Sequence, residues 1–224
     1  MEGLSQDLFL LCLDEHNGNM RSAEAELGFA GAVLMELIDR EYITVDEKKK
    51  VILQHNDTTG NSLQDEFLDR IAKAKRLKTL EDWVNILSSG IHHLPSRVAE
   101  PLVQSGVLSE EVHKTLGLFP SRRFHLNNPG RQSEVAERVR AILLKTREPN
   151  KRDLALISLA NSMELVDHLL SREERKMVKK TLKELTSEEM MADAVGDAIA
   201  AMQAAVAISV VTSIATTSAS TSGS

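Results

Sequence analysis

The chain is 224 residues long and carries 27 Lys and Arg against 33 Asp and Glu, for a net charge of -6, while 42% of its residues are hydrophobic. This balance excludes a disordered polyanion and a basic nucleic-acid coat, because there are enough apolar residues for a core and no overall positive charge. The single cysteine, Cys12, cannot form an internal disulfide and no secretory signal opens the chain. We therefore expect a reducing, cytosolic environment.

The charges are distributed unevenly along the chain. Residues 1–47 contain eleven acids and two bases, whereas residues 48–185 contain 25 bases and 18 acids. A basic centre between acidic ends can present a positive face to phosphate or to an anionic membrane. An ordinary solvated helix surface would have the same composition, so both interpretations stay open.

Apolar residues recur at three- and four-residue steps in several segments, which predicts amphipathic helices. In chain order, these stripes are Leu8, Leu11 and Cys12; the long segment Ser22 to Arg40; Leu63, Phe67, Ile71 and Ala74; Leu80, Trp83, Val84 and Leu87; Val135, Val139, Ile142 and Leu143; and Met177, Val178, Leu182 and Leu185. Leu154 to Ala160 is apolar nearly all round, which predicts a central helix. The polar face of the last helix carries Arg175, Lys176, Lys179, Lys180 and Lys183.

Two segments between these helices have the pattern of hairpins. Tyr42 to Val45 and Lys50 to Gln54 are rich in β-branched residues and are separated by a charged turn. The second candidate runs from Thr115 to Leu126, with Pro120 and Ser121 as its turn. Further signals predict Ser62 as a helix cap after a polar loop.

The end of the chain is uncharged from Ala198 onward. Residues 198–215 are Ala-rich, include Gln203, Ser209 and Thr212, and lack aromatic anchors, so a closing core helix is favoured over a membrane span. Residues 216–224 are rich in Thr and Ser, which predicts a disordered tail. We therefore expect one domain over residues 1–215.

Motifs that indicate catalysis are missing from the sequence. There is no phosphate-binding glycine loop, dinucleotide fingerprint, zinc-ligand cysteine set or nucleophile elbow. Gly28 and Gly31 have the spacing of an RNA-clamping GxxG, but they lie in a helical stripe, so close helix packing is the favoured interpretation. A hydrolase with a triad assembled from distant segments is the least favoured alternative.

The segment from His92 to Arg97 suggests anion binding. Pro95 suits the first turn of a helix and Leu94 is a poor cap, so helix-start N–H groups would be left open. Together with Arg97 and the imidazoles of His92 and His93, they would form a phosphate cradle. The alternatives are an ordinary helix start and, less favoured, a metal site at the two histidines. Pro101 is expected to shorten or kink this helix.

An ordered set of segments resembles the Golgi phosphoprotein 3 family from about residue 6 to 210. The segments are LFLLCL at 8–13, GFAGAVLMEL at 28–37 with the hairpin that follows, TGNSLQDEFLDRI at 59–71, TLEDWVNILS at 79–88, LVQSGVL at 102–108, and LALISLANS followed by ELVDHL within 152–169. The resemblance implies a mainly α-helical bundle with a protruding β-hairpin that acts without catalysis and without a cofactor. Family members are peripheral proteins of the cytosolic membrane face that recognise phosphatidylinositol 4-phosphate, and eukaryotic members link glycosyltransferases to vesicle coats.

The resemblance also identifies positions for a lipid pocket. The family's tryptophan and three arginines fall at Arg21, Ala30, His92 and Pro95, so none of the four residue types is kept. Because an unperturbed histidine is mostly neutral at pH 7, the pocket would rely on Arg21 and Arg97. The coat-recruiting N-terminal tail of the family is not matched.

The sequence thus predicts a non-enzymatic, cytoplasmic protein on the membrane periphery. Its expected headgroup-binding residues are Arg21, His92, His93 and Arg97, with no catalytic or metal-binding residue. Expected partners are an anionic phospholipid or phosphoinositide at the membrane surface, a membrane-protein cargo, and a second copy of the chain through the 42–54 hairpin. The alternative function is a winged-helix-like DNA-binding regulator built on Ser96–Ser105 and the Thr115–Leu126 hairpin, but nucleic acid is not expected because Arg97 is the only base of that helix.

Overall fold

The structure, a computed structural model, describes residues 3–115, 119–187 and 204–211 of the chain. Helices and two antiparallel hairpins alternate along it. In chain order they are α1 (Leu4–Cys12), α2 (Ala25–Asp39), β1 (Ile43–Val45), β2 (Val51–Leu53), α3 (Ser62–Ala72), α4 (Leu80–Gly90), α5 (Leu94–Gln104), β3 (Leu108–Thr115), β4 (Phe119–Leu126), α6 (Pro129–Leu143), α7 (Lys151–Ser162), the short 3-10 helix η1 (Val166–Leu169) and α8 (Arg172–Leu185). The predicted mainly α-helical fold with small hairpins is confirmed.

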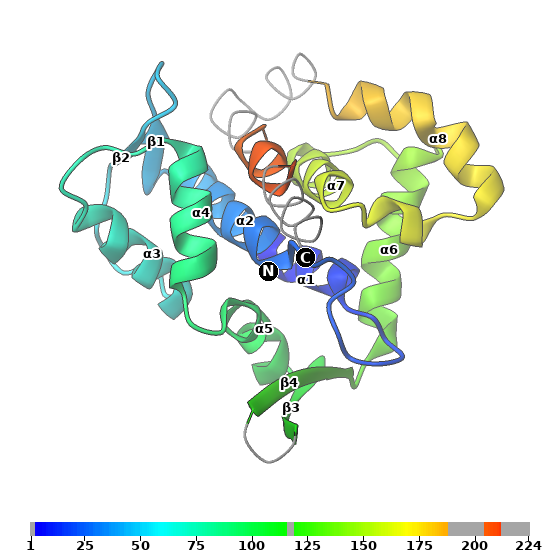
Figure 1. The fold of residues 1–224 in the computed structure, drawn as a ribbon. Helices are drawn as coiled ribbons and strands as arrows, with labels where there is room; N and C mark the ends of the chain where they lie inside the picture. Colours follow the sequence, from blue (N-terminus) through cyan, green and yellow to red (C-terminus); the bar gives the residue numbers. More distant parts are fainter. Residues whose placement is uncertain (1–2, 116–118, 188–203, 212–224) are drawn as a thin grey trace, which may run out of the picture.

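The core is centred on α1 and α2. Every residue of α1 is buried, and this helix contacts α2, α5, α6 and α7. Figure 1 shows α3 and α4 on one side of this pair, α6 to α8 on the other, and α5 with the β3–β4 hairpin below them. Phe9 of α1 packs between α2 and β4. Its ring stacks on Phe29 of α2 at 5.5 Å and meets Phe124 of β4 edge-on at 5.0 Å, both measured between ring centroids.

The helix predicted to be central and the close packing predicted for the paired glycines are both confirmed. Residues 153–160 of α7 are all buried. A Cβ atom built on Gly28 would overlap the side chain of Met163, and one built on Gly31 would overlap Val206. These glycines therefore let a helix chain approach α2 closely, and they are not an RNA clamp.

The first hairpin lies where it was predicted. β1 and β2 pair from Ile43↔Leu53 to Val45↔Val51, and the turn between them is held by Asp46, whose carboxylate accepts the N–H groups of Lys48 and Lys50. The segment just before α4 pairs alongside β2, because the N–H of Val51 donates to the carbonyl of Lys78 at 2.9 Å.

The second hairpin is longer than predicted, and its turn is elsewhere. β3 and β4 pair from Leu108↔Leu126 to Thr115↔Phe119, so Pro120 and Ser121 are strand residues and the prediction that they form the turn is wrong. A proline is tolerated here because both strands of a two-stranded sheet are edges, where the missing N–H need not belong to the ladder. The connecting residues 116–118 lie outside the described part of the chain.

Two further predictions are corrected or tested in part. Asn61, and not Ser62, caps α3, since its side chain accepts the N–H groups of Leu63 and Gln64. The closing core helix predicted at 198–215 is described at 204–211 only, where Ala205, Val206 and Val210 are buried. The tail at 216–224 lies outside the described residues. No helix in the described ranges is both long enough and apolar enough to cross a membrane.

Candidate functional site

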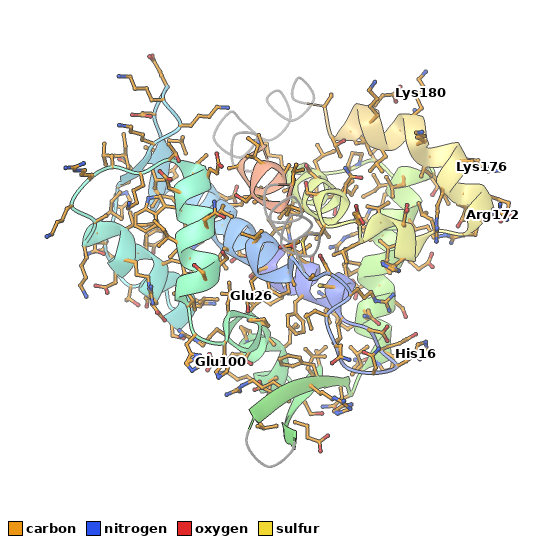
Figure 2. All side chains as sticks on the ribbon, viewed as in Figure 1. His16, Glu26, Glu100, Arg172, Lys176 and Lys180 are labelled. Atoms are coloured by element: carbon orange, nitrogen blue, oxygen red, sulfur yellow. The ribbon has the colours of Figure 1, made fainter. Side chains whose placement is uncertain are left out.

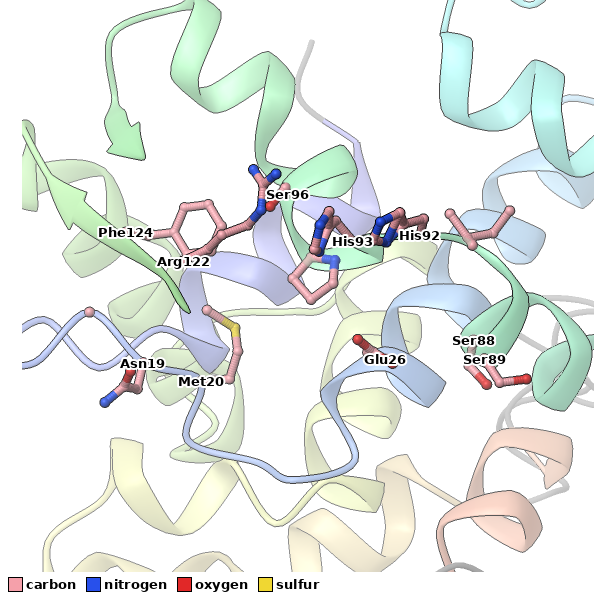
Figure 3. A pocket seen from close by; sticks show the side chains of 13 residues that line it. Asn19, Met20, Glu26, Ser88, Ser89, His92, His93, Ser96, Arg122 and Phe124 are labelled. Carbon is pink, nitrogen blue, oxygen red and sulfur yellow. The ribbon is translucent and has the colours of Figure 1, made fainter. Parts of the chain in front are cut away.

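A cavity of about 430 Å³ lies where α4 ends and α5 begins. Four parts of the chain line it: the loop before α2, α2 itself, the α4–α5 junction and β4. The lining residues are Gly18, Asn19, Met20, Glu26, Ser88, Ser89, Ile91, His92, His93, Pro95, Ser96, Arg122 and Phe124. Figure 3 shows the two imidazoles lying between Arg122 on one side and Ser88 and Ser89 on the other.

The start of α5 is shaped by an unusual backbone conformation. The N-cap is His93, in the left-handed region at φ 53° and ψ 46°, and its side chain accepts no hydrogen bond from the helix. Pro95, in the first turn, has no N–H to satisfy. The predicted lack of a side-chain cap is confirmed, although the cap position is His93 and not Leu94. Pro101 does not end the helix, which continues to Gln104.

The two histidines form a stacked pair, with 3.8 Å between ring centroids and 28° between planes. Desolvation lowers the pKa of His93, and the nearby Arg122 and His92 lower it further, against a smaller opposing effect of Glu110. A lowered pKa keeps this imidazole neutral at pH 7. The ring can then stack and exchange hydrogen bonds, but it carries charge only in acid or beside a bound anion.

Arg122 is the cation that lines this cavity, and it is not among the headgroup-binding residues expected from the sequence, where it counts only as a base of the hairpin in the DNA-binding alternative. Its Nη1 donates to Glu110 Oε1 at 2.8 Å, and Ser96 Oγ donates to the same oxygen. Burial raises the pKa of Glu110, but these hydrogen bonds outweigh it and the net pKa is lowered, so Glu110 is ionised. The Nε of Arg122 is buried and has no hydrogen-bond partner among the described atoms.

One signal could have found this arginine. Successive side chains of a strand alternate between its faces, so Arg122 and Phe124 share a face of β4. Phe124 is 4% exposed and packs on the core, which turns Arg122 towards the protein body as well. The turn signal of Pro120 and Ser121 conceals this alternation in the sequence.

The cavity also contains an acid. Glu26 of α2 lines it, and partial desolvation raises the pKa of its carboxyl group. At neutral pH, Glu26 and Glu110 oppose the charge of Arg122. A fall in pH removes negative charge from Glu26 and adds positive charge to His93, so anion affinity should rise.

The other predicted site residues lie elsewhere. Arg21 lines a separate cavity of about 410 Å³ with Asp167, His168 and Arg175, and its Nε donates to the carbonyl of Leu13 at 3.2 Å. Of the four positions that the resemblance indicates, His92 and Pro95 line the 430 Å³ cavity, whereas Arg21 does not and Ala30 is fully buried in α2.

Arg97 is held in an ion pair. Its Nη1 donates to Glu66 Oε2 at 2.8 Å, and Arg70 donates to the other oxygen of Glu66 at 3.0 Å. Arg70 also donates to the carbonyl of Gly90, so this group ties α3 to the end of α4 and to α5. Because Arg97 is the only base of α5, the helix offers no unpaired cation to a DNA phosphate.

A larger cavity of about 770 Å³ lies between α1, α2, α3 and α7. Its most enclosed acid is Glu36, whose pKa is raised by desolvation against hydrogen bonds from Ser5 and Gln64. Those bonds join α2 to α1 and α3, which is a structural use of the carboxylate. In the part of the chain that the structure describes, no group of three or more His, Cys, Asp or Glu could hold a metal ion.

Comparison with known protein families identifies this architecture. The family model described as Golgi phosphoprotein 3 (GPP34) matches residues 4–202, which include every described element from α1 to α8. That family is non-enzymatic and Golgi-associated. The match covers most of the sequence, and the chain belongs to the Golgi phosphoprotein 3 (GPP34) family.

Proposed function

We propose that this protein is a peripheral membrane protein that binds the phosphorylated headgroup of a phosphoinositide, or of another anionic lipid, in the 430 Å³ cavity. The observation that carries the proposal is the convergence of the stacked His92–His93 pair and Arg122 at the start of α5. A helix start without a side-chain cap supplies N–H donors and the positive end of the dipole to a phosphate.

Within the cavity, each group has a proposed role. Arg122 supplies the permanent positive charge, and its guanidinium is a charge-assisted donor for a phosphate oxygen. His92 and His93 supply ring N–H groups, and His93 gains charge when a bound phosphate stabilises its imidazolium. Arg21 and Arg97, which are engaged elsewhere, would act only through the long-range potential.

The wider role follows from the resemblance. It supports a cytoplasmic position on the membrane surface, action without catalysis or cofactor, an adaptor role towards membrane proteins, and self-association through the 42–54 hairpin. The cavity does not depend on that hairpin, so the lipid proposal can be tested by itself.

The test is flotation of the protein with phosphatidylcholine vesicles that contain phosphatidylinositol 4-phosphate, phosphatidylserine or neither. His93→Asn combined with Arg122→Gln should reduce binding to phosphoinositide vesicles, because both cavity donors are weakened; asparagine tolerates the left-handed backbone of position 93. His55→Asn, at an exposed histidine in the loop after β2, is the control for the histidine change and should bind like wild type. Equal binding by the double variant and the control would refute the cavity as the headgroup site.

A further inference from the structure

A row of cations runs along the outer face of α8. At 100° per residue, Arg172, Lys176, Lys179, Lys180 and Lys183 fall within roughly 100° of the helix circumference. All five are exposed, while Val178 and Thr181 on the opposite face are buried. Figure 2 shows the side chains of Arg172, Lys176 and Lys180 directed away from the body of the protein. We call these five residues the α8 stripe.

In the described part of the chain, the acids of α8 are Glu173, Glu174 and Glu184, and they leave most of the charge of the stripe unbalanced. Glu174 is bound by Arg140 of α6, and Glu184 is shared by Lys145 at 3.3 Å and Lys180 at 3.6 Å. Lys180 is 89% exposed, so its pair with Glu184 contributes little. Among the described residues, none makes an ion pair with the remaining four members of the stripe.

This arrangement is unfavourable for the helix itself. Stripe residues three and four apart, such as Lys176, Lys180 and Lys183, face one another as like charges, which destabilises a helix. Burial of the inner face of α8 does not require cations on the outer face, because uncharged polar residues there would be solvated equally well. A row of uncompensated cations at the surface therefore indicates an anionic partner.

We propose that the α8 stripe lies against an anionic bilayer as a second, diffuse contact, which deepens and rests on the proposed lipid-binding function. Three observations favour a bilayer over an acidic protein or a nucleic acid. The stripe lies on the outer face of a helix with its side chains directed away from the body of the protein (Figure 2), which suits a flat partner. Four of the five cations are lysines, which act as point charges and do not provide the bidentate geometry that recognises one carboxylate or phosphate. Met177, at the margin, is 72% exposed and gives an apolar contact for the interface.

The α8 stripe is separate from the cavity. α8 packs on α6 and α7, whereas the cavity is built from α2, the α4–α5 junction and β4. Figure 1 shows α8 at the opposite end of the molecule from the β3–β4 hairpin. The two contacts can therefore be removed independently.

The test is vesicle binding over a salt series, with phosphatidylserine in phosphatidylcholine and no phosphoinositide. At roughly a 5-fold effect for each basic residue near an anionic surface, Lys176→Gln/Lys180→Gln/Lys183→Gln should bind about 100-fold more weakly and with a smaller salt dependence. Glutamine keeps the helix propensity of lysine. The matched control, Lys73→Gln/Lys75→Gln/Lys151→Gln, removes the same charge from exposed positions outside α8, the cavity and the 42–54 hairpin, and should stay within a few-fold of wild type.

Each outcome decides for or against the stripe. Unchanged binding by the α8 triple variant, or an equal loss in the control, overturns the proposal, because binding would then be independent of α8 or follow net charge alone. Stripe-dependent binding of duplex DNA or of a polyglutamate peptide as strong as vesicle binding would also overturn it in favour of that partner. The His93→Asn/Arg122→Gln variant tests the cavity separately: adding the α8 triple change to it should weaken phosphatidylserine binding further by the same factor as in wild type, because α8 and the cavity do not share residues.

Discussion

Gly31→Ala is expected to loosen the packing of the 204–211 helix, whereas Gly28→Ala should be nearly neutral. Both glycines are buried inside α2, and each substitution gains about 1 kcal/mol of helix propensity. They differ in what the new methyl group meets. At Gly28 it meets the flexible end of Met163, and at Gly31 it meets a branch of Val206.

The magnitude follows from the freedom of the two neighbours. Met163 has a long unbranched side chain and lines the 410 Å³ cavity, so it can move aside and offset the propensity gain by only about 1 kcal/mol. Val206 is fully buried and stiff at χ1, so the helix that carries it must retreat by roughly 1 Å to reach van der Waals contact. Overpacking of this kind costs about 1 to 3 kcal/mol, which after the propensity gain of about 1 kcal/mol leaves Gly31→Ala less stable by up to about 2 kcal/mol.

Urea unfolding gives the two free energies of unfolding, and hydrogen exchange of the 204–211 amides locates the effect. The expected result is a loss of stability and of protection at 204–211 for Gly31→Ala alone. If Gly31→Ala were as stable as wild type with unchanged protection there, the packing of Val206 on α2 would be refuted. Equal destabilisation by both variants would show that the side-chain flexibility of Met163 and Val206 does not determine the loss in free energy of unfolding.

Three further predictions concern polar groups of the fold. Asp7 is fully buried and accepts Arg138 at 2.6 Å and Arg152 at 2.8 Å, so Asp7→Asn should cost about 3 to 5 kcal/mol in urea unfolding, and a cost below about 1 kcal/mol would contradict the network. Asn61→Ala should lose about 1 kcal/mol of stability because it removes the cap of α3, and Ser62→Ala, the control, should lose less. A larger loss for Ser62→Ala than for Asn61→Ala would identify Ser62 as the cap. Hydrogen bonds from Arg140 and Ser171 lower the pKa of Glu174 to about 2, so its contribution is present above the unfolded pKa near 4.5 and is lost as pH falls towards 2. The stability difference between wild type and Arg140→Gln should shrink over that window, and a difference independent of pH would exclude this linkage.

Most helices could be predicted because their apolar periodicity directly reflects burial. The stripe between Ser22 and Arg40 became α2, and the apolar segment 154–160 became a buried part of α7. The turn of the second hairpin was misplaced because Pro120 is an ordinary turn signal. Its position in an edge strand depends on pairing with Lys114, which local sequence does not specify.

The candidate site was predictable only in part. His92 and His93 were found because they precede a proline at a helix start, which is a local pattern. Arg122 reaches the same cavity from a distant strand, and the separate surroundings of Arg21 and Arg97 result from tertiary packing. Local patterns identify the groups of a cavity that one segment supplies, and they miss those supplied by the fold.

The ion pair of Arg97 with Glu66 changes how a mutational scan of this protein must be interpreted. Glu66 also accepts a hydrogen bond from Arg70, which donates to the last residue of α4. Arg97, Glu66 and Arg70 therefore connect α5, α3 and α4. An Arg97 substitution that abolished vesicle binding would first of all report a shifted α5, and with it a displaced pair of imidazoles. Only a substitution whose melting curve matches wild type can assign that arginine a direct part in recognition.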